Sequence, residues 1–452
     1  MNVVDLLRRP EGKTLEFKRD LSSPKGVLRS IVAFANTAGG IVLIGVEDKT
    51  KDVTGVEGPR AMEERIANLV SDRISPRLVP DIEILPWRQT TVVAIEVHPS
   101  SLRPHHLTRE GEAKGTYVRV GSTNRRADPA MIEELRRYSR NESFDESPMP
   151  DLDSEAIDFR AASESFAPFR ELARRDLVSL GILAKHQGRL VPTVGGMLLF
   201  GHERERHFPD AWIQAGRFAG TNKAKILDHR EFRDYPVPAI EEAIGFVTDH
   251  LRRGATIEGV RREDRWELPL VAVREAVINA VAHADYSQQG APIRVALYDD
   301  RLEIESPGLL PFGLIIDDLT HGTSRLRNRV IGRVLHELKL IEQWGSGIPR
   351  MESACRDAGL ASPEFEEIGQ RFRVILRTGR VGEPTTDALD DTILAWLSDG
   401  EGRSTAQIAT HIKRSPRATR TRLAALVERG LVREIGTGPQ DPKRRYYRTE
   451  TP

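Results

Sequence analysis

Two polar side chains at helical spacing draw attention for the chemistry that they can perform together. Glu275 and Asn279 lie four residues apart in the segment REAVINA, residues 274–280. On a helix this spacing places both side chains on one face. There the amide oxygen of Asn279 can coordinate Mg²⁺ while the Glu275 carboxylate orients a water molecule beside a γ-phosphate. Because the pair alone is a weak signal, a solvated helix face without catalytic function is the alternative.

Glycine-containing stretches follow this pair in a fixed order. ESPGLLP spans residues 305–311, and GSGI spans residues 345–348, whose backbone amides can approach a phosphate. Together with HADY at residues 283–286, this order resembles the GHKL family of gyrase-like and histidine-kinase-like ATPases over about residues 268–376. The resemblance implies ATP with Mg²⁺, Glu275 as the base of an ATPase and Asn279 as the metal ligand. It also implies that nucleotide is bound by Asn279, Asp285, Gly308, Thr323, Asn328, Gly345 and Gly347.

One position departs from that family. Its members use an aspartate to read the amino group of adenine, whereas this chain has Glu305 and Ser306 at that place. Because the missing aspartate is the group that reads adenine in that family, the resemblance does not by itself imply adenine specificity or ATP turnover. The chain also has no G-x-x-x-x-G-K-[ST] motif, which argues against a P-loop motor.

The N-terminal segment holds a second set of charged side chains. EGKTLEFKR spans residues 11–19, FANTAGG residues 34–40 and IGVED residues 44–48. This series resembles the Schlafen AlbA_2 domain over about residues 1–140. The resemblance implies nucleic-acid binding, with Arg19 among the contacts, or else a divalent-metal-dependent endoribonuclease. In the second case the catalytic residues are Glu11, Glu16, Lys18, Glu47 and Asp48, and the metal ligands are Glu11, Glu16 and Asp48.

The physical reason for the nuclease is that converging carboxylates can hold Mg²⁺ or Mn²⁺ beside a scissile phosphate. The alternative is that Glu16 and Lys18 form structural ion pairs. We treat the nuclease as a second hypothesis for this reason.

The C-terminal segment is locally basic. Residues 403–448 hold 12 Lys and Arg against three Asp and Glu. Helices predicted over 390–397, 405–412 and 417–429, with strands over 431–435 and 445–448, resemble the winged helix-turn-helix of bacterial transcriptional regulators. Such a unit neutralises phosphates and reads a DNA groove, although some winged helices bind proteins instead. The candidate DNA contacts are Arg414, Arg417, Arg420, Arg422, Lys443, Arg444 and Arg445.

The elements that position these residues predict a multidomain α+β chain. We expect an AlbA_2 domain over residues 1–140 and a middle α/β region over 152–265. A GHKL-like α/β sandwich over 266–378 and a winged helix-turn-helix over 389–450 are expected to follow. The acidic, Ser- and Pro-containing segment 141–153 is typical of a linker. In the middle region we expect helices over 166–180 and 239–252 and strands over 195–200 and 211–218. In the sandwich we expect a helix over 270–283 and strands over 293–298 and 301–306.

Composition and net charge exclude several classes of protein. The 452 residues include 67 Lys and Arg, 67 Asp and Glu and one cysteine. A net charge of zero excludes a uniformly basic nucleic-acid coat but not a local basic face. The single cysteine excludes a disulfide scaffold. No apolar run approaches the ~20 residues of a membrane span, so we expect a cytoplasmic protein without a membrane partner.

Taken as a whole, the architecture resembles RecG-related, AlbA_2-containing transcriptional regulators. We therefore expect a DNA-binding, ATP-binding regulator that forms a homo-oligomer, because such regulators commonly act on repeated or palindromic sites. RNA is the alternative partner. The alternative functions are the Schlafen-like endoribonuclease and a GHKL-type ATPase in a defence setting.

Overall fold

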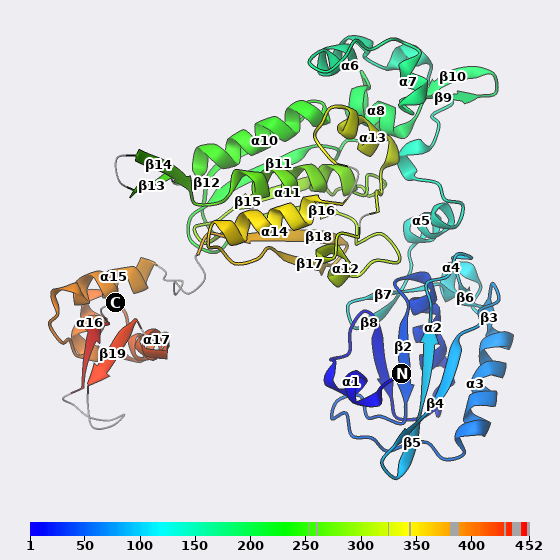
Figure 1. Cartoon of the computed structure of the whole chain (residues 1–452), viewed down its shortest axis with the longest axis horizontal. Coiled ribbons are helices and arrows are strands. Elements are labelled where there is room, and N and C mark those ends of the chain that lie inside the picture. Colours follow the sequence, from blue (N-terminus) through cyan, green and yellow to red (C-terminus); the bar gives the residue numbers. More distant parts are fainter. Residues whose placement is uncertain are drawn as a thin grey trace.

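The computed structural model describes residues 1–251, 253–258, 261–323, 325–342, 345–379, 388–428, 431–435 and 444–449. The chain forms an N-terminal, a central and a C-terminal unit, which are coloured blue to cyan, green to yellow, and orange to red in Figure 1. None of the helices in these ranges combines the length and the apolar character that a membrane crossing requires.

The N-terminal unit is built on a four-stranded sheet of order β1-β2-β5-β4, in which β1 and β2 are parallel and the other pairs antiparallel. Alternate residues of a strand face opposite sides. Val42 and Ile44 therefore join a core with α2 and α3, whereas Leu43 joins another with α1. The elements are α1 Val3–Arg8, β1 Leu15–Lys18, α2 Pro24–Asn36, β2 Gly40–Ile44, α3 Pro59–Arg73, β3 Ile74–Ser75, β4 Asp81–Trp87, β5 Thr90–Val97, β6 His106–Leu107, α4 Glu112–Gly115, β7 Tyr117–Val120, β8 Thr123–Arg126 and α5 Pro129–Ser139.

The segment predicted as a linker, residues 141–153, is packed into the central unit. It contains the short helix η1 (Phe144–Glu146), and Asp145 within it is fully buried. The Asp145 carboxylate accepts hydrogen bonds from the backbone N–H groups of Arg329, Val330 and Ile331 at 2.7–2.9 Å. Asp145 therefore caps helix α13 (Arg329–Glu337) from a distant part of the chain. The segment joins the two units but is packed rather than solvated, because the acidic side chain of Asp145 satisfies orphan donors at a helix start.

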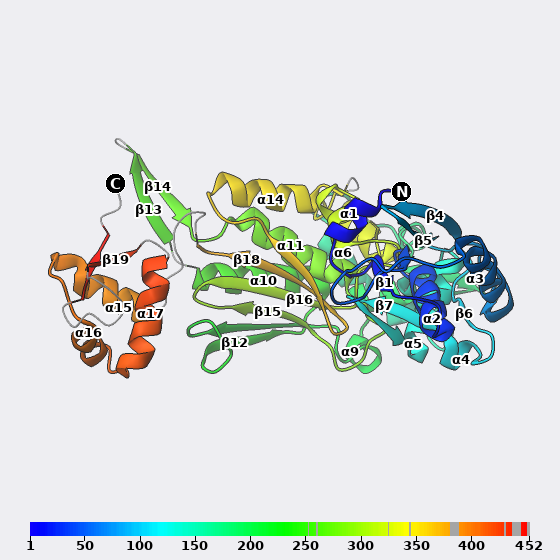
Figure 2. The ribbon, with the colours of Figure 1, turned by 90° about the horizontal axis from the view of Figure 1, so that it is seen from below.

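The central unit is built on a six-stranded sheet of order β12-β11-β15-β16-β18-β17. β11 and β15 are parallel, and the other neighbours are antiparallel. Helices α10, α11 and α14 lie side by side across one face of the sheet (Figures 1 and 2). These elements are β11 Ile213–Phe218, β12 Ile226–Phe232, α10 Pro236–His250, α11 Leu270–His283, β15 Ile293–Leu297, β16 Arg301–Pro307, α12 Ile316–Thr320, α14 Gly347–Asp357, β17 Glu364–Ile368 and β18 Arg371–Arg377.

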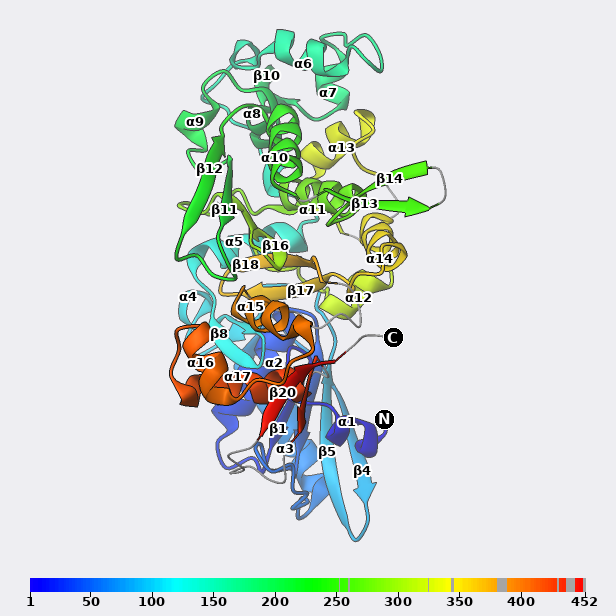
Figure 3. The same ribbon diagram turned by 90° about the vertical axis from the view of Figure 1, so that its left-hand side faces the viewer.

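This sheet includes strands from both sides of the predicted division at residues 265 and 266. β11 and β12 precede the division, and the other strands follow it. One hydrophobic core also contains both Ile213 and Ile304. The division between the middle region and the sandwich therefore runs through a single sheet. A hairpin at this place projects from the central unit in all three views (Figure 3), and its strands are β13 Arg253–Glu258 and β14 Arg261–Trp266.

Two element predictions in the middle region were wrong. Residues 195–200 form not a strand but helix α8 (Val194–Phe200), which begins where the Thr193 hydroxyl accepts a hydrogen bond from the Gly196 N–H at 2.9 Å. A short buried apolar run does not by itself distinguish the two structures. The predicted helix over 166–180 is interrupted after Phe166, close to Pro168, which cannot donate a backbone hydrogen bond. The remaining elements are η2 Ser154–Ala156, α6 Phe159–Phe166, α7 Asp176–Ser179, β9 Leu183–His186, β10 Arg189–Pro192 and α9 Arg204–His207.

The C-terminal unit follows the element order expected from the sequence. A capping box starts its second helix, because the Ser404 hydroxyl accepts from the Gln407 N–H and the Gln407 amide accepts from the Ser404 N–H. Leu423, Leu426 and Tyr446 pack in its core. Its elements are α15 Ala388–Trp396, η3 Leu397–Asp399, α16 Thr405–His411, α17 Pro416–Glu428, and the antiparallel strands β19 Val432–Ile435 and β20 Arg445–Arg448.

Candidate functional site

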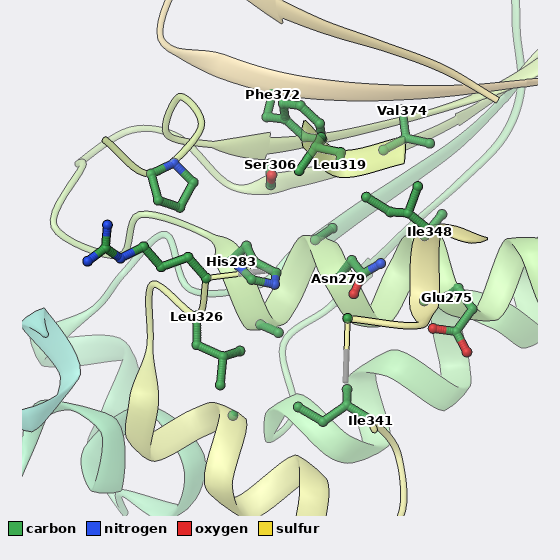
Figure 4. A pocket seen from close by; sticks show the side chains of 18 of the residues that line it. Glu275, Asn279, His283, Ser306, Leu319, Leu326, Ile341, Ile348, Phe372 and Val374 are labelled. Carbon is green, nitrogen blue, oxygen red and sulfur yellow. The ribbon is translucent and has the colours of Figure 1, made fainter. Parts of the chain in front are cut away.

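A cavity of about 500 Å³ lies between α11, the sheet and the segments that precede α13 and α14 (Figure 4). A cavity of this size is in the range that small-molecule and cofactor sites occupy. Its polar lining residues are Glu275, Asn279, His283, Ser306, Thr323, Arg325, Arg329, Arg333, His336, Glu342, Ser346 and Arg350.

Helix α11 presents Glu275 and Asn279 from one face to one end of this cavity. The first residue of α14, Gly347, lies against both side chains. A Cβ atom at Gly347 would lie 2.8 Å from Glu275 Oε2 and 3.3 Å from Asn279 Nδ2. Glycine therefore allows the N-terminus of α14, with its unpaired N–H groups, to approach the pair. Gly345 lines the same end.

Glu275 is buried but not isolated. Arg350 Nη1 lies 3.5 Å from Glu275 Oε1 and 3.0 Å from Glu342 Oε1. Burial raises the pKa of the Glu275 carboxyl, and the positive charge of Arg350 opposes that rise. A raised pKa suits a carboxylate that must accept a proton near neutral pH.

Asn279 makes no side-chain hydrogen bond to any residue in the described part of the chain, and it lines the cavity. An amide without a partner at a cavity wall is available to a ligand. Its oxygen and the phosphates of a bound nucleotide would form a typical Mg²⁺ ligand set. The residues at this end therefore fit a magnesium-bound polyphosphate.

The other end of the cavity is mostly apolar. Leu319, Phe372 and Val374 line it beside Ser306 from β16 and His283 from α11 (Figure 4). Gly308, at φ +101°, forms the turn that follows Ser306. A flat aromatic base fits such walls.

Two predicted nucleotide contacts lie elsewhere. Asp285 does not line this cavity, because its carboxylate accepts hydrogen bonds from Ser287 Oγ at 2.6 Å and Gln288 Nε2 at 3.0 Å. Asn328 is fully buried and donates to the carbonyls of Ala282 and Ala284 at 3.1 and 2.8 Å. It ties the end of α11 to the start of α13. Thr323, in contrast, lines the cavity.

The segment that rims the cavity before and at the start of α13, residues 325–329 and here called the lid, is held by the N-terminal unit. Arg327 forms an ion pair with Glu134 of α5. The Arg325 guanidinium lies 4.2 Å from the centre of the Tyr138 ring and donates to its hydroxyl. Arg329 donates to the Asn141 carbonyl at 2.6 Å. These contacts join residues 187 to 193 positions apart, so sequence spacing contained no signal for them.

The N-terminal carboxylates fall into two groups. Glu16 is buried between Arg119, which is 1% exposed, and Lys18 Nζ at 2.6 Å. Glu11 Oε1 accepts from the Phe17 N–H at 2.6 Å, and burial with a hydrogen bond to Asp48 raises the pKa of Glu11 to about 6. Glu16 and Lys18 thus form the structural ion pairs that were the alternative to catalysis.

Glu47 lies with Arg19 rather than with the other carboxylates, at 3.2 Å from Arg19 Nε. Across the described residues, no three His, Cys, Asp or Glu side chains are grouped in a way that would hold a metal ion. Of the predicted metal ligands, Glu11 lies near both Asp48 and Glu16, whose charges help to raise its pKa.

The predicted basic contacts of the C-terminal unit differ in availability. Arg414, Arg417 and Arg420 are exposed at and before α17. Arg422 pairs with Asp390 at 2.5 Å, and Arg444 with Glu434 at 2.9 Å, so both hold elements together. Arg445 is half-buried on β20 and donates to the carbonyl of its neighbour. Lys443 lies outside the described residues.

Two family models match the chain, one in the N-terminal unit and one in the central unit. Residues 11–128 match the family model "Schlafen, AlbA_2", and residues 290–376 match "Putative ATP-dependent DNA helicase recG C-terminal", an HATPase-type model. No curated protein matches the chain.

The solved structures that are similar to the chain include the following two. A crystal structure of a protein from Corynebacterium diphtheriae is 22% identical, with a TM-score of 0.43, and the match covers 94% of this chain and 91% of that one. The solution structure of the N-terminal domain of a RecG-related protein from Nitrosomonas europaea is 24% identical, with a TM-score of 0.23, covering 28% and 94%. From the family models, the chain contains a Schlafen AlbA_2 domain followed by a RecG-type, HATPase-like domain.

Proposed function

We propose that this protein is a DNA-binding transcriptional regulator whose HATPase-like domain binds ATP with Mg²⁺. The observation that carries the proposal is the cavity beside α11, where the unpartnered Asn279, the buried Glu275 and the start of α14 meet. When bound, Mg²⁺ would neutralise phosphate charge at this end. Asn279 would hold the ion, and Glu275 would orient water beside the terminal phosphate.

The DNA-binding part of the proposal rests on the C-terminal unit. Its three helices and antiparallel strand pair follow the order of a winged helix-turn-helix. α17 takes the place of the recognition helix, and Arg417 and Arg420 are exposed on it. Exposed arginines on such a helix suit phosphate and base contacts in a major groove. We also propose a homo-oligomer, because such units commonly bind paired half-sites.

The lid contacts suggest how nucleotide and nucleic acid would communicate. Arg325 and Arg329 line the cavity and also bind Tyr138 and Asn141 at the end of the AlbA_2 domain. A nucleotide that draws these arginines toward its phosphates would weaken their contacts with Tyr138 and Asn141, and so the attachment of the AlbA_2 domain. The two binding events would then affect each other through one segment.

The test measures binding of the full chain to labelled duplex DNA by fluorescence anisotropy, over a range of salt concentrations. The double variant Arg417→Glu, Arg420→Glu is expected to weaken binding by roughly tenfold or more and to flatten the salt dependence, because phosphate contacts are lost. The control Arg160→Glu, Arg175→Glu reverses two exposed charges of the central unit and keeps wild-type binding. Equal affinities for both double variants would reject the DNA-binding role of α17.

The same preparation tests the nucleotide site by calorimetry with Mg-ATP. Asn279→Ala is expected to weaken Mg-ATP binding by roughly tenfold or more, since it removes the proposed metal ligand. Asn222→Ala, in the turn between β11 and β12, is the matched control. Unchanged Mg-ATP binding in Asn279→Ala would reject the site.

A further inference from the structure

The mostly apolar end of the cavity, where a nucleobase would fit, contains the hydroxyl group of Ser306. Ser306 on β16 is 5% exposed, lines the cavity and makes no side-chain hydrogen bond to any described residue. A buried hydroxyl without a protein partner implies that a ligand or water satisfies it. A hydroxyl both donates and accepts, whereas an ionised carboxylate only accepts.

On the opposite wall, His283 is a second side chain that can both donate and accept a hydrogen bond. His283 comes from the last turn of α11 and faces the cavity near Ser306 (Figure 4). Burial, with a contribution from the positive charge of Arg327, lowers the pKa of His283 to about 4. The ring is therefore neutral at pH 7, with one nitrogen that donates and one that accepts.

The carboxylates near this end do not reach it. Glu305, the neighbour of Ser306, points to the opposite face of β16, where it binds Arg373 at 2.6 Å. Among the described lining residues the carboxylates are Glu275 and Glu342, which meet at Arg350. Glu275 precedes His283 by eight residues of helix, about 12 Å along its axis. No carboxylate among the described lining residues therefore lies at the Ser306 end of the cavity.

We propose that Ser306 and His283 make this site accept guanine nucleotides as well as adenine nucleotides. The inference rests on the proposed nucleotide site and concerns only its choice of base. Adenine presents a donor, its exocyclic amine, where guanine presents the acceptor O6. A carboxylate would attract the first and repel the second. Ser306 and His283 can rotate or exchange a proton to pair with either pattern.

The test compares binding of Mg-ATP and Mg-GTP to the full chain by calorimetry, in the wild type and in the isosteric pair Ser306→Asp and Ser306→Asn. In the wild type the two dissociation constants are expected to agree within about tenfold. Ser306→Asp, which only accepts, is expected to raise the GTP-to-ATP ratio of dissociation constants by roughly tenfold or more. Ser306→Asn has the same shape and keeps a donor, so its ratio stays near that of the wild type.

The outcomes separate the inference from the proposal beneath it. A wild-type preference for ATP of more than about tenfold overturns the inference and leaves the nucleotide site intact. An equal ratio in Ser306→Asp and Ser306→Asn overturns the role of Ser306. Failure of both nucleotides to bind the wild type overturns the proposed function together with the inference. Circular dichroism of both variants checks that the fold is retained.

Discussion

At the scale of single residues, the N-terminal carboxylates differ in what surrounds them. Glu16 is compensated by Arg119 and Lys18, so replacing it would leave a buried charge without its partner. A loss of activity in a Glu16 variant would therefore not distinguish catalysis from stability. Glu11 and Asp48 share a hydrogen bond, and no Lys or Arg in the described part of the chain forms an ion pair with either carboxylate, so a Glu11 variant is the better test of this domain.

Glu11 predicts a pH dependence of stability. Its pKa is about 6 in the folded protein against a usual value of 4.5, so the folded state binds more protons between these values. Stability is then lost as the pH rises from about 4.5 to 6. Glu11→Gln removes this loss, so the variant gains stability over the wild type across that window in urea denaturation. Glu64→Gln, an exposed residue of α3, is the control, and parallel pH profiles for all three proteins would contradict the prediction.

At the scale of elements, helix α13 depends on a cap supplied from far away in the chain. Its first N–H groups donate to Asp145, and its other side lines the cavity through Arg333 and His336. The cap thus links the segment that joins the N-terminal and central units to one wall of the proposed nucleotide site.

Asp145→Ala is expected to destabilise the central unit by about 2 kcal/mol, since a helix cap contributes roughly that much at the upper end of its range. Asp145→Asn retains one acceptor oxygen and loses less. Thermal unfolding of both variants measures the difference, with the exposed Asp151→Ala as the control. A melting temperature for Asp145→Ala equal to that of the control would mean that the cap contributes nothing.

At the scale of the whole molecule, the N-terminal and central units are joined by charged contacts around the lid. Arg327 pairs with Glu134 and lies 3.8 Å from Asp285. Lys13 Nζ contacts Glu367 at 2.8 Å, and Glu367 accepts from the Leu310 N–H in the cavity wall. These contacts connect the N-terminal unit directly to segments that form the cavity wall, so a change at the cavity can reach the N-terminal unit.

Glu134→Gln tests that transmission. In the wild type we expect Mg-ATP to change the affinity for nucleic acid by roughly fivefold or more, the lower end of typical coupling. Weakening the Arg327 pair should reduce that factor by at least half. Glu133→Gln, the exposed neighbour on α5, should retain it. Fluorescence anisotropy with and without Mg-ATP gives both factors, and an unchanged factor in Glu134→Gln would show that the pair does not transmit.

Several features of the structure could be predicted from residues that lie close together in the sequence. The spacing of Glu275 and Asn279 defined one face of a helix, because four residues make about one turn. The caps and turns of the C-terminal unit also depend on neighbours within a few residues, and its helices and strands were predicted close to their observed bounds. Both matched family models fall within the predicted AlbA_2 and GHKL-like units.

Other features were decided only by the tertiary structure, because they depend on residues far apart in the chain. The cap from Asp145, the pairing of Glu16 with Arg119 and the lid contacts of Arg327 join distant segments. The sheet unites strands on both sides of a predicted boundary, since hydrogen bonds between strands do not depend on sequence separation. The sequence by itself therefore determined which side chains could do chemistry. Packing decided that Asn279 faces a cavity, that Asn328 ties α11 to α13, and that Asp285 bonds to Ser287 away from the cavity.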